Sequence, residues 1–578
     1  MSSNRPSDTV RYEPDENPPI LVAVGTGIQA ALVNLGGIVI GAVIVFRIAG
    51  QPESYIPWAI FAALIVSGIS TFLQAVRFWR IGSGHILVMG TSGAFIAVCV
   101  TALVEGGPAT MASLIVISSL FQFLLASRLS WLRRIFTPVV SGTVIMLIAV
   151  AVMPIIFDTL KDVPENASPI AAPIAALSTI IVIAVLIMRA PPSLRLWSPI
   201  IGIIVGCAVA APFGLYDLNA VLESDWVGVP FGSWPGIELT PGIEFWALLP
   251  AFIVVTLVGA IETVGDGVAI QQVSRRNRRA TDFRVVQGAL NSDGLGNLLS
   301  GLLGTLPNTT YSSSVSLTEV TGIASRRVGV VIGIIFAVLA FFPKATALLI
   351  AIPAPVAAAY ITVLLALLFV QGMRMIIQDG VDHRKAAVVG LAFWLGVGFQ
   401  SQVIFSDLLG GFWGVLLGNG MTSGAIVAIL MMLFLDFTGP RSKRLTSDLN
   451  SDALIKLEPF LREFASARKW EPESTDRLAA AGEETIAVLM QEVDAGDADG
   501  PRRLTVSARG DAQSAELEFA TTLEGENMED QLAYLSELPP VPDEHEVSYR
   551  LLWHYASSVS HQKYHSIDVI TIRVEASR

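Results

Sequence analysis

Apolar stretches of about 20 residues recur along this chain from residue 20 to residue 436. A helix needs roughly 20 such residues to cross about 30 Å of hydrocarbon. Hydrophobic residues make up 53% of the chain and charged residues only 15%, which is too apolar for a water-soluble protein. We therefore predict an all-α polytopic membrane protein. The expected spans cover residues 20–46, 56–76, 86–104, 109–127, 135–157, 170–188, 197–216, 243–272, 286–304, 306–324, 327–343, 350–374, 386–404 and 410–435.

Loop charge supports the same count of fourteen spans. Of the 22 basic residues before Pro440, 19 lie in the N-terminal segment or in alternate loops. Loops on the cytoplasmic side of a membrane collect Lys and Arg. We therefore expect both termini to face the cytoplasm, which requires an even number of spans.

The chain changes character near residue 440. The last 138 residues carry 15 basic and 26 acidic side chains, so nearly all of the net charge of −12 lies there. This acidic excess disfavours nucleic acid as a partner. The resulting division is a cytoplasmic tail at 1–19, a transmembrane domain at 20–436, a linker at 437–453 and a cytoplasmic domain at 454–578. Within the last domain, hydrophobic patterns predict helices at 454–469, 474–492 and 546–560, and strands at 502–509, 515–521 and 567–574, which together suggest an α+β sandwich.

Four acidic residues interrupt the apolar stretches: Glu262, Asp266, Asp293 and Glu319. Charged groups at membrane depth are costly and are usually retained for function. Glu262 and Asp266 are four residues apart, so both carboxylates lie on one face of a helix. Such a pair could hold or release a proton, although a purely structural polar cluster is the plainer alternative.

The sequences of two expected spans do not predict continuous helices. Residues 85–95 and 306–319 each join a short β-prone stretch to small polar residues and then to an apolar run. Extended backbone at membrane depth is tolerated only where protein or a water-filled cavity satisfies it. Discontinuous spans of this kind form substrate sites in many secondary transporters. They fall in spans three and ten, seven apart, which suggests two inverted seven-span repeats, unless the Gly and Ser residues serve only helix packing.

At these residues the chain resembles the nucleobase/ascorbate transporter family, also called nucleobase:cation symporter family 2, which includes bacterial uracil and xanthine permeases. The resemblance covers roughly residues 12–436. Its marks are Gly27 and Gln29, Gly90–Ser92, Glu262 and Asp266, Asp293 and Gly294, Pro307–Ser312, Thr321, Ser325 and Arg326, and Ile352–Val356.

The resemblance implies a core domain and a gate domain, with short strands in spans three and ten and with substrate bound between the domains. Glu262 would bind ring N–H groups of a nucleobase, and Asp266 would support it and take part in proton coupling. Backbone groups near Gly93 and Ser312 would bond the edges of the substrate. The implied protein is a proton-coupled symporter working by an elevator motion, as a homodimer in the bacterial cytoplasmic membrane, with H⁺ or else Na⁺ as coupling ion, no cofactor, no metal and no enzymatic activity.

Several positions depart from the family pattern. Ala30 replaces the usual His after Gln29, and Gly93 replaces an aromatic residue. Ser313 and Ser314 stand where the family has Glu or Gln followed by Asn, so we expect these serines to line the substrate site and to alter specificity. Glu319 replaces a small residue. We expect Glu319 either to pair with an Arg or to be a second titrating site, and we expect Gln29 to support proton coupling.

The cytoplasmic domain resembles the histidine-kinase-type ATPase fold of small anti-sigma-factor kinases. The Asn that binds Mg²⁺ in that family is absent, since Ala487 and Val488 occupy the candidate positions, and the segment 521–525 has only one Gly. A regulatory or dimerising module without nucleotide, with a cytoplasmic regulatory partner, is the expected role. The histidines of this domain, His545, His554, His561 and His565, form no convincing metal-ligand set.

Two other functions fit the sequence less well. An anion transporter of the sulfate-permease fold would place two acids near an anionic ligand. This is disfavoured because the acids and the ligand carry the same sign of charge and repel each other. A sensor that binds a base without moving it, and signals through the cytoplasmic domain, is compatible with the altered binding positions. An enzyme is disfavoured because the membrane part offers no nucleophile with a base and no metal spacing.

Overall fold

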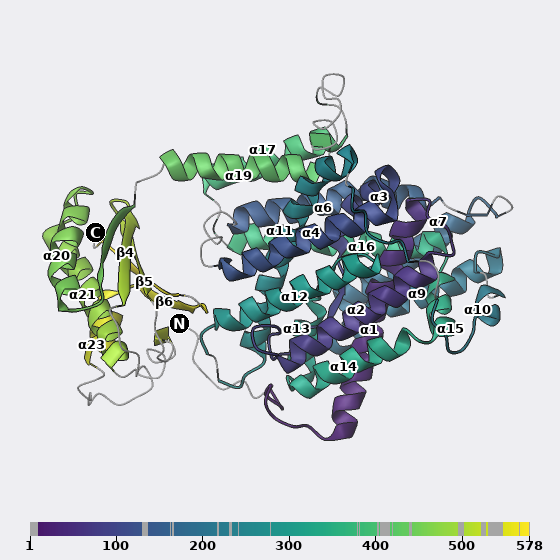
Figure 1. Ribbon diagram of the computed structural model, residues 1–578, viewed down its shortest axis with the longest axis horizontal. Coiled ribbons are helices and arrows are strands. Elements are labelled where there is room, and N and C mark those ends of the chain that lie inside the picture. The colour runs from purple at the N-terminus through teal and green to yellow at the C-terminus, as the bar shows by residue number, and fades with distance from the viewer. Residues whose placement is uncertain are drawn as a thin grey trace. The chain divides into compact units, whose positions relative to one another are not determined.

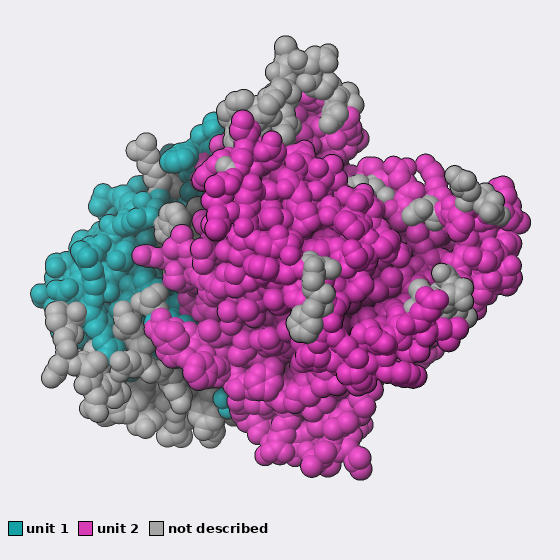
Figure 2. Space-filling model, turned by 45° about the vertical axis from the view of Figure 1, so that its right-hand side comes forward, with its two compact units in different colours: residues 1–4, 277–284, 434–578 teal, residues 5–276, 285–433 magenta. Residues whose placement is uncertain are grey.

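A computed structural model describes residues 10–129, 137–161, 163–164, 167–216, 219–230, 234–240, 242–277, 279–378, 380, 382–401, 404, 417–418, 420–438, 442–494, 502–521, 528–529, 547–565 and 567–576. Its contacts divide the chain into two compact units, coloured separately in Figure 2. The larger unit holds residues 5–276 and 285–433, and the smaller holds residues 1–4, 277–284 and 434–578.

Helices dominate the chain up to Thr438 (Figure 1). They are α1 (Ile20–Ile48), α2 (Ile56–Val76), α3 (Ile96–Glu105), α4 (Gly107–Ser127), α6 (Pro138–Thr159), α7 (Ala171–Arg189), α8 (Pro192–Arg195), α9 (Ser198–Ala210), α10 (Asn219–Glu223), α11 (Ile243–Val273), α12 (Phe283–Leu303), α13 (Ser313–Thr321), α14 (Arg326–Leu339), α15 (Pro343–Ile350), α16 (Ala354–Gln378), α17 (His383–Gln400) and α19 (Gly420–Thr438). Short 3₁₀ turns η1 (Gly93–Phe95) and η2 (Ala211–Phe213) complete the set.

Eight of the described helices are long and apolar enough to cross a membrane, and α14 and α15 form a further candidate bent by 86°. A multi-pass, mostly helical membrane protein is therefore confirmed, while fourteen spans and two inverted repeats stay predictions. The helix α12 fails the test of apolarity although it fills the ninth expected span, because Asn291, Asp293 and Asn297 interrupt it. Residues 410–416, at the start of the fourteenth expected span, lie outside the described residues.

Spans three and ten are broken, as their sequences predict. β1 (Met89–Thr91) and β2 (Asn308–Thr310) form a buried antiparallel ribbon, with Met89 opposite Thr310 and Thr91 opposite Asn308. Each strand is followed within three residues by a helix start, η1 after β1 and α13 after β2. Since the strands are antiparallel, η1 and α13 leave from opposite ends of the ribbon. The free N–H groups of their first turns are available near its two ends.

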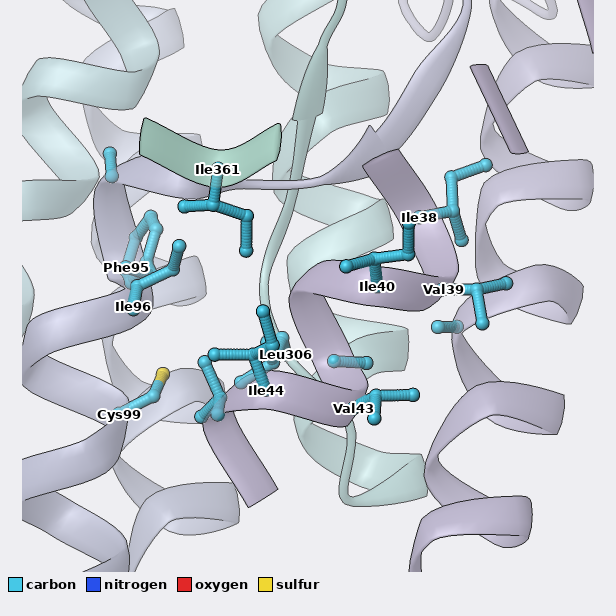
Figure 3. Packing of buried hydrophobic residues seen from close by; sticks show 14 of the residues in the cluster. Ile38, Val39, Ile40, Val43, Ile44, Phe95, Ile96, Cys99, Leu306 and Ile361 are labelled. Atoms are coloured by element: carbon cyan, nitrogen blue, oxygen red, sulfur yellow. The ribbon is translucent and has the colours of Figure 1, made fainter. Parts of the chain in front are cut away.

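Apolar packing holds this ribbon in place (Figure 3). Side chains of α1, including Ile38 and Ile44, lie in one buried cluster with Phe95 at the end of η1, Ile96 at the start of α3 and Leu306 just before β2. Phe95 also lies near Phe252 of α11, with ring centroids 6.2 Å apart. Burying aromatic and branched side chains on all sides orients the short strands, which are too short to be stable alone.

Glycines allow two helix pairs to approach closely. A Cβ on Gly68 of α2 would lie 2.7 Å from the carbonyl oxygen of Gly333 on α14, and one on Gly333 would lie equally close to the carbonyl of Gly68. The pair Gly142 and Gly372 does the same for α6 and α16, at 2.5 and 2.6 Å. Small residues at helix contacts are typical of membrane proteins, because close backbone approach replaces hydrophobic driving force.

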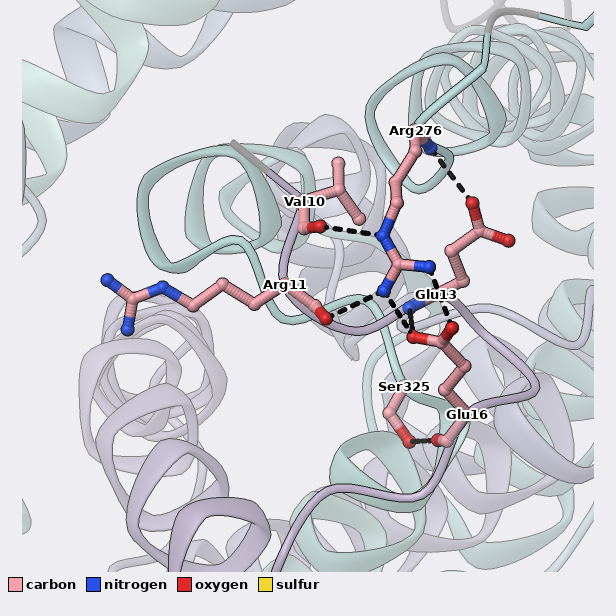
Figure 4. A network of polar contacts seen from close by, with 6 residues as sticks. All are labelled: Val10, Arg11, Glu13, Glu16, Arg276 and Ser325. Atoms are coloured by element: carbon pink, nitrogen blue, oxygen red, sulfur yellow. Dashed lines mark hydrogen bonds and ion pairs between the residues drawn. The ribbon is translucent and has the colours of Figure 1, made fainter. Parts of the chain in front are cut away.

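An N-terminal segment before α1 lies against the ends of α11 and α13 (Figure 4). The guanidinium of Arg276 donates to both carboxylate oxygens of Glu16 and to the carbonyls of Val10 and Arg11. The backbone N–H groups of Arg11 and Tyr12 donate to the carbonyl of Gly322, just after α13. Residues 10–16 therefore link elements that are far apart in the sequence.

The smaller unit contains a five-stranded antiparallel sheet in the order β3-β4-β5-β7-β6. Its elements are β3 (Lys443–Asp448), α20 (Ser451–Ser466), α21 (Pro472–Asp494), β4 (Arg503–Gly510), β5 (Ser514–Thr521), α23 (Val547–Tyr555), β6 (Ser558–Lys563) and β7 (Asp568–Glu575). Leu457, Leu489, Leu517 and Ile572 belong to one buried core between helices and sheet. The expected small α+β domain is thus present, and three of its strands match the sequence prediction within one residue.

Two features of this unit differ from the prediction. The helix expected over 546–560 ends at Tyr555, and residues 558–563 form β6, which pairs with β7 at the edge of the sheet. Residues 443–448, expected within a linker, form β3 at the opposite edge. Both are edge strands whose polar sequences carry little hydrophobic pattern, because only one neighbouring strand and one face need be buried. His545 lies outside the described residues.

Candidate functional site

Asp266 of α11 is held between β2 and α13. Its Oδ2 accepts a hydrogen bond from the hydroxyl of Thr310 and its Oδ1 accepts one from the hydroxyl of Ser312, each at 2.7 Å. The side chain is only 5% exposed. Two neutral donors therefore satisfy a buried carboxylate, and they fix the last residue of β2 and the start of α13 against the middle of α11.

A second buried carboxylate, Asp293 of α12, extends this polar network. Its Oδ2 accepts from Thr263 of α11 and from Gln122 of α4, each at 2.7 Å. The amide of Asn297 donates to Oε1 of Gln122 at 2.8 Å, and Oδ1 of Asn297 accepts from the backbone N–H of Asn308 at 2.6 Å. Buried polar groups are costly unless satisfied, so this network specifies how α4, α11, α12 and β2 pack.

Glu262 lies one turn before Asp266 on α11 and differs from it in its surroundings. Its side chain is partly exposed, and its carboxylate has no hydrogen-bond partner among the described residues. Nearby, at Gly259, a Cβ would lie 3.8 Å from the ring of Phe95, so this part of α11 packs beside η1. Glu262 is thus an acceptor without a described partner, on a stretch of α11 that packs beside η1.

Gly93 and Ser312, named from the resemblance as backbone contacts, are both exposed: Gly93 lies between two buried residues and Ser312 between two partly exposed ones. A Cβ on Gly93 would meet nothing within 4 Å. The absent aromatic ring therefore leaves space at the start of η1 that no described side chain fills.

The two serines after Ser312 have different environments. The hydroxyl of Ser313 donates to Oδ1 of Asn34 on α1 at 2.6 Å, and Ser313 is partly exposed. Ser314 is 1% exposed; its hydroxyl donates to the carbonyl of Tyr311 and accepts from the backbone N–H of Val88. The proton of Ser314 therefore stays within its own segment, and its oxygen links the start of α13 to Val88, just before β1, whereas Ser313 is partly exposed.

Gln29 and Glu319 are not in this network. Gln29 lies partly exposed on α1, and Glu319 is exposed on α13, two turns from Ser312 on the same side of the helix. Neither side chain has a hydrogen bond or an ion pair with a described residue. The expected pairing of Glu319 with an Arg is thus not seen in the part of the chain that the structure describes.

Sequence reasoning missed several residues of the site. Asn34, Gln122, Asn297 and Thr310 are buried polar residues inside or beside apolar stretches. Polar amides at membrane depth are rarer than Ser or Thr, so Asn34 and Gln122 could have been identified by the same criterion as the acids. Thr310 could not, because its role depends on the register of β2 against α11.

Comparison with known proteins places the chain in a family. The family described as Permease family, that of xanthine and uracil permeases, matches residues 22–404. A putative purine permease of Clostridium perfringens is 29% identical over 426 residues, covering 73% of this chain and 92% of that protein. The xanthine permease XanP of Escherichia coli is 26% identical over 438 residues, covering 73% and 94%.

A solved structure, the transmembrane domain of a cyanobacterium bicarbonate transporter, aligns with 73% of this chain at 16% identity and a TM-score of 0.44. The sequence matches alone cover about three quarters of the chain and nearly the whole of each relative. Members of the matched family are transporters and not enzymes. The chain belongs to the xanthine/uracil permease family, whose model matches its residues 22–404.

Proposed function

We propose that this protein is a proton-coupled symporter of a nucleobase in the bacterial cytoplasmic membrane. Its family and the names of its relatives, a purine permease and a xanthine permease, support a planar nitrogen heterocycle as substrate. We further propose the family layout, with fourteen spans in two inverted repeats, an elevator motion of a core against a gate, a homodimer and cytoplasmic termini.

The observation that carries the proposal is the contrast between Glu262 and Asp266. The carboxylate of Asp266 is satisfied by two hydroxyls, whereas that of Glu262, one turn away, is partly exposed and has no partner among the described residues. A carboxylate in this position suits the N–H groups of a heterocycle. The backbone N–H groups at the starts of η1 and α13 suit carbonyl or ring nitrogen acceptors.

Proton coupling is supported by the donors around the acids. Among the described residues, the hydrogen bonds to Asp266 and Asp293 come from neutral side chains, those of Thr310, Ser312, Thr263, Gln122 and Asn297. These neutral donors do not balance the negative charge of the acids. A transported cation is therefore a natural counter-charge for them. We assign the proton to Glu262 or Asp266. Na⁺ is the other ion to test.

We propose that the smaller unit is a regulatory or dimerising module that binds no nucleotide. In its regulatory role it would bind a cytoplasmic partner protein. Its sheet and helices carry a separate hydrophobic core. Among the described residues no three His, Cys, Asp or Glu side chains come together as a metal site. His561 is buried, and its Nδ1 accepts from the backbone N–H of Met528.

The test is uptake of labelled bases into proteoliposomes with an imposed inward proton gradient. We expect Glu262→Gln to lower uptake at least about 100-fold while Glu244→Gln, an exposed acid at the start of the same helix, leaves it unchanged. Replacing the proton gradient with a Na⁺ gradient distinguishes the two coupling ions. Saturable binding without uptake would favour a sensor, and unaltered uptake by Glu262→Gln would overturn the assigned role.

A further inference from the structure

The hydroxyl of Ser313 can act toward a substrate only as an acceptor. Its single proton is donated to Oδ1 of Asn34 at 2.6 Å. The orientation of the Asn34 amide is determined, because its Nδ2 donates to the carbonyl of Ala30 at 2.8 Å and a carbonyl can only accept. Asn34 is 6% exposed. Turning the Ser313 proton away would leave a buried acceptor unpaired, which is unfavourable.

Ser312, the neighbouring exposed residue, is limited in the same way. Its proton is donated to Oδ1 of Asp266, while Thr310 occupies Oδ2 of the same carboxylate. With Asp266 ionised, Ser312 therefore has only lone pairs to offer. The third open side chain, Glu262, is an acceptor as a carboxylate.

Ser313 thus presents lone pairs outward whatever the charge on the two acids, and Ser312 and Glu262 do so while Asp266 and Glu262 are ionised. From this we infer that the part of the substrate facing the hydroxyls of Ser312 and Ser313, as distinct from the backbone N–H groups of the same turn, carries N–H donors, as an amino-substituted base does, and that a carbonyl facing these hydroxyls is rejected. This inference rests on the proposed function and names the substrate class of the same site. A carbonyl oxygen placed against these hydroxyls would meet lone pairs without gaining a hydrogen bond.

Asn34 is then a positioning residue: it fixes the direction of the Ser313 proton and thereby the preference for amino-substituted bases. It acts through Ser313, on the side of α1 that lies against the start of α13. The space beside Gly93 adds room for an exocyclic group without contributing a donor, since no side chain is present there.

Matched pairs of bases test the inference by competition against uptake and by binding to the full-length protein in detergent. Guanine and xanthine carry an amine or a carbonyl at C2, and adenine and hypoxanthine carry them at C6. In at least one pair we expect the amino base to bind about tenfold tighter or more. Tighter binding of the carbonyl base, or equal binding, in both pairs would overturn the inference and leave the transport proposal standing.

Variants separate positioning from a merely structural role. Asn34→Leu frees the proton of Ser313, so the preference for the amino base should fall about tenfold. Adding Ser313→Ala to Asn34→Leu should cancel the part of that shift due to the freed proton. Thr26→Val, at another buried polar position of α1, should leave the preference unchanged. An equal loss of affinity for all four bases in Asn34→Leu would show that Asn34 only supports the fold.

Combining the two readouts distinguishes the two proposals. Binding with the expected order but no uptake would overturn transport and keep the inferred specificity. If none of the bases binds, both proposals fail.

Discussion

The guanidinium of Arg276 and the carboxylate of Glu16 form an ion pair with two hydrogen bonds, 2.7 Å from Nη1 to Oε1 and 2.6 Å from Nη2 to Oε2. The pair joins the N-terminal segment to the end of α11, on residues that lie outside the expected spans. Its geometry is the planar, two-pronged arrangement that gives Arg–carboxylate pairs their specificity.

This pair predicts a pH-dependent contribution to stability. Hydrogen bonds from Arg276, and then from the backbone N–H of Glu13, hold the pKa of Glu16 below its usual value. A carboxyl group with a lowered pKa stabilises the folded state above the unfolded pKa of about 4.3, and that stabilisation is lost as pH falls through the lowered value. Glu16→Gln should therefore lower the melting temperature in detergent at pH 7.

The difference between Glu16→Gln and the wild type should shrink as the pH falls below about 4. Glu244→Gln, which removes an exposed acid without a resolved ion pair, serves as the control. A difference that stays constant from pH 7 to pH 3.5 would show that the side chain acts by packing and not by charge.

Two glycines near the ribbon should respond in opposite ways to alanine. A Cβ on Gly90 would lie 2.5 Å from the ring of Tyr311, whereas a Cβ on Gly93 would meet nothing within 4 Å. Overpacking a close contact costs about 1–3 kcal/mol. Gly90→Ala should thus lower the yield and melting temperature of the protein, and Gly93→Ala should not. Equal stability of the two variants in a thermal-shift measurement would contradict the packing of Tyr311 against β1.

Removing one donor to Asp266 should weaken the site. Thr310→Val deletes the hydroxyl that Oδ2 of Asp266 accepts from, at nearly constant volume. Leaving a buried acceptor short of a partner costs about 1–3 kcal/mol, so we expect a lower melting temperature and reduced uptake.

Thr309→Val is a close control for that change. Thr309 is the preceding residue of the same strand, and its buried hydroxyl oxygen has no hydrogen-bond partner among the residues that the structure describes. It should be neutral or slightly stabilising, because a buried unsatisfied group is removed. If the two valine variants behaved alike, the hydrogen bond to Asp266 would not be what matters at Thr310.

The amide of Gln122 should be needed for stability. It donates to Asp293 and accepts from Asn297, so Gln122→Leu removes one hydrogen-bond partner from each of two buried groups. We expect destabilisation by about 2 kcal/mol or more, measured by unfolding in detergent. Ser118→Ala, one turn earlier on α4, removes a hydroxyl that donates only to the carbonyl of Ile115 and should cost much less.

Much of the architecture could be predicted because its causes are local. Apolar runs long enough to span hydrocarbon identify most of the helices, and short β-prone stretches in spans three and ten predicted the strands that the structure forms. In the smaller unit, β4, β5 and β7 followed their alternating patterns, while the edge strands β3 and β6 did not show one.

The site divides in the same way. The sequence by itself determined the carboxylates, since a charge inside an apolar helix stands out against its neighbours, and the spacing of Glu262 and Asp266 along α11 followed from helix geometry alone. Only the tertiary structure decided which carboxylate is satisfied and where each hydroxyl proton points. Those depend on Thr310, Ser312 and Asn34 reaching their partners across β2, α13 and α1, contacts between residues 44 to 279 positions apart that no local pattern encodes.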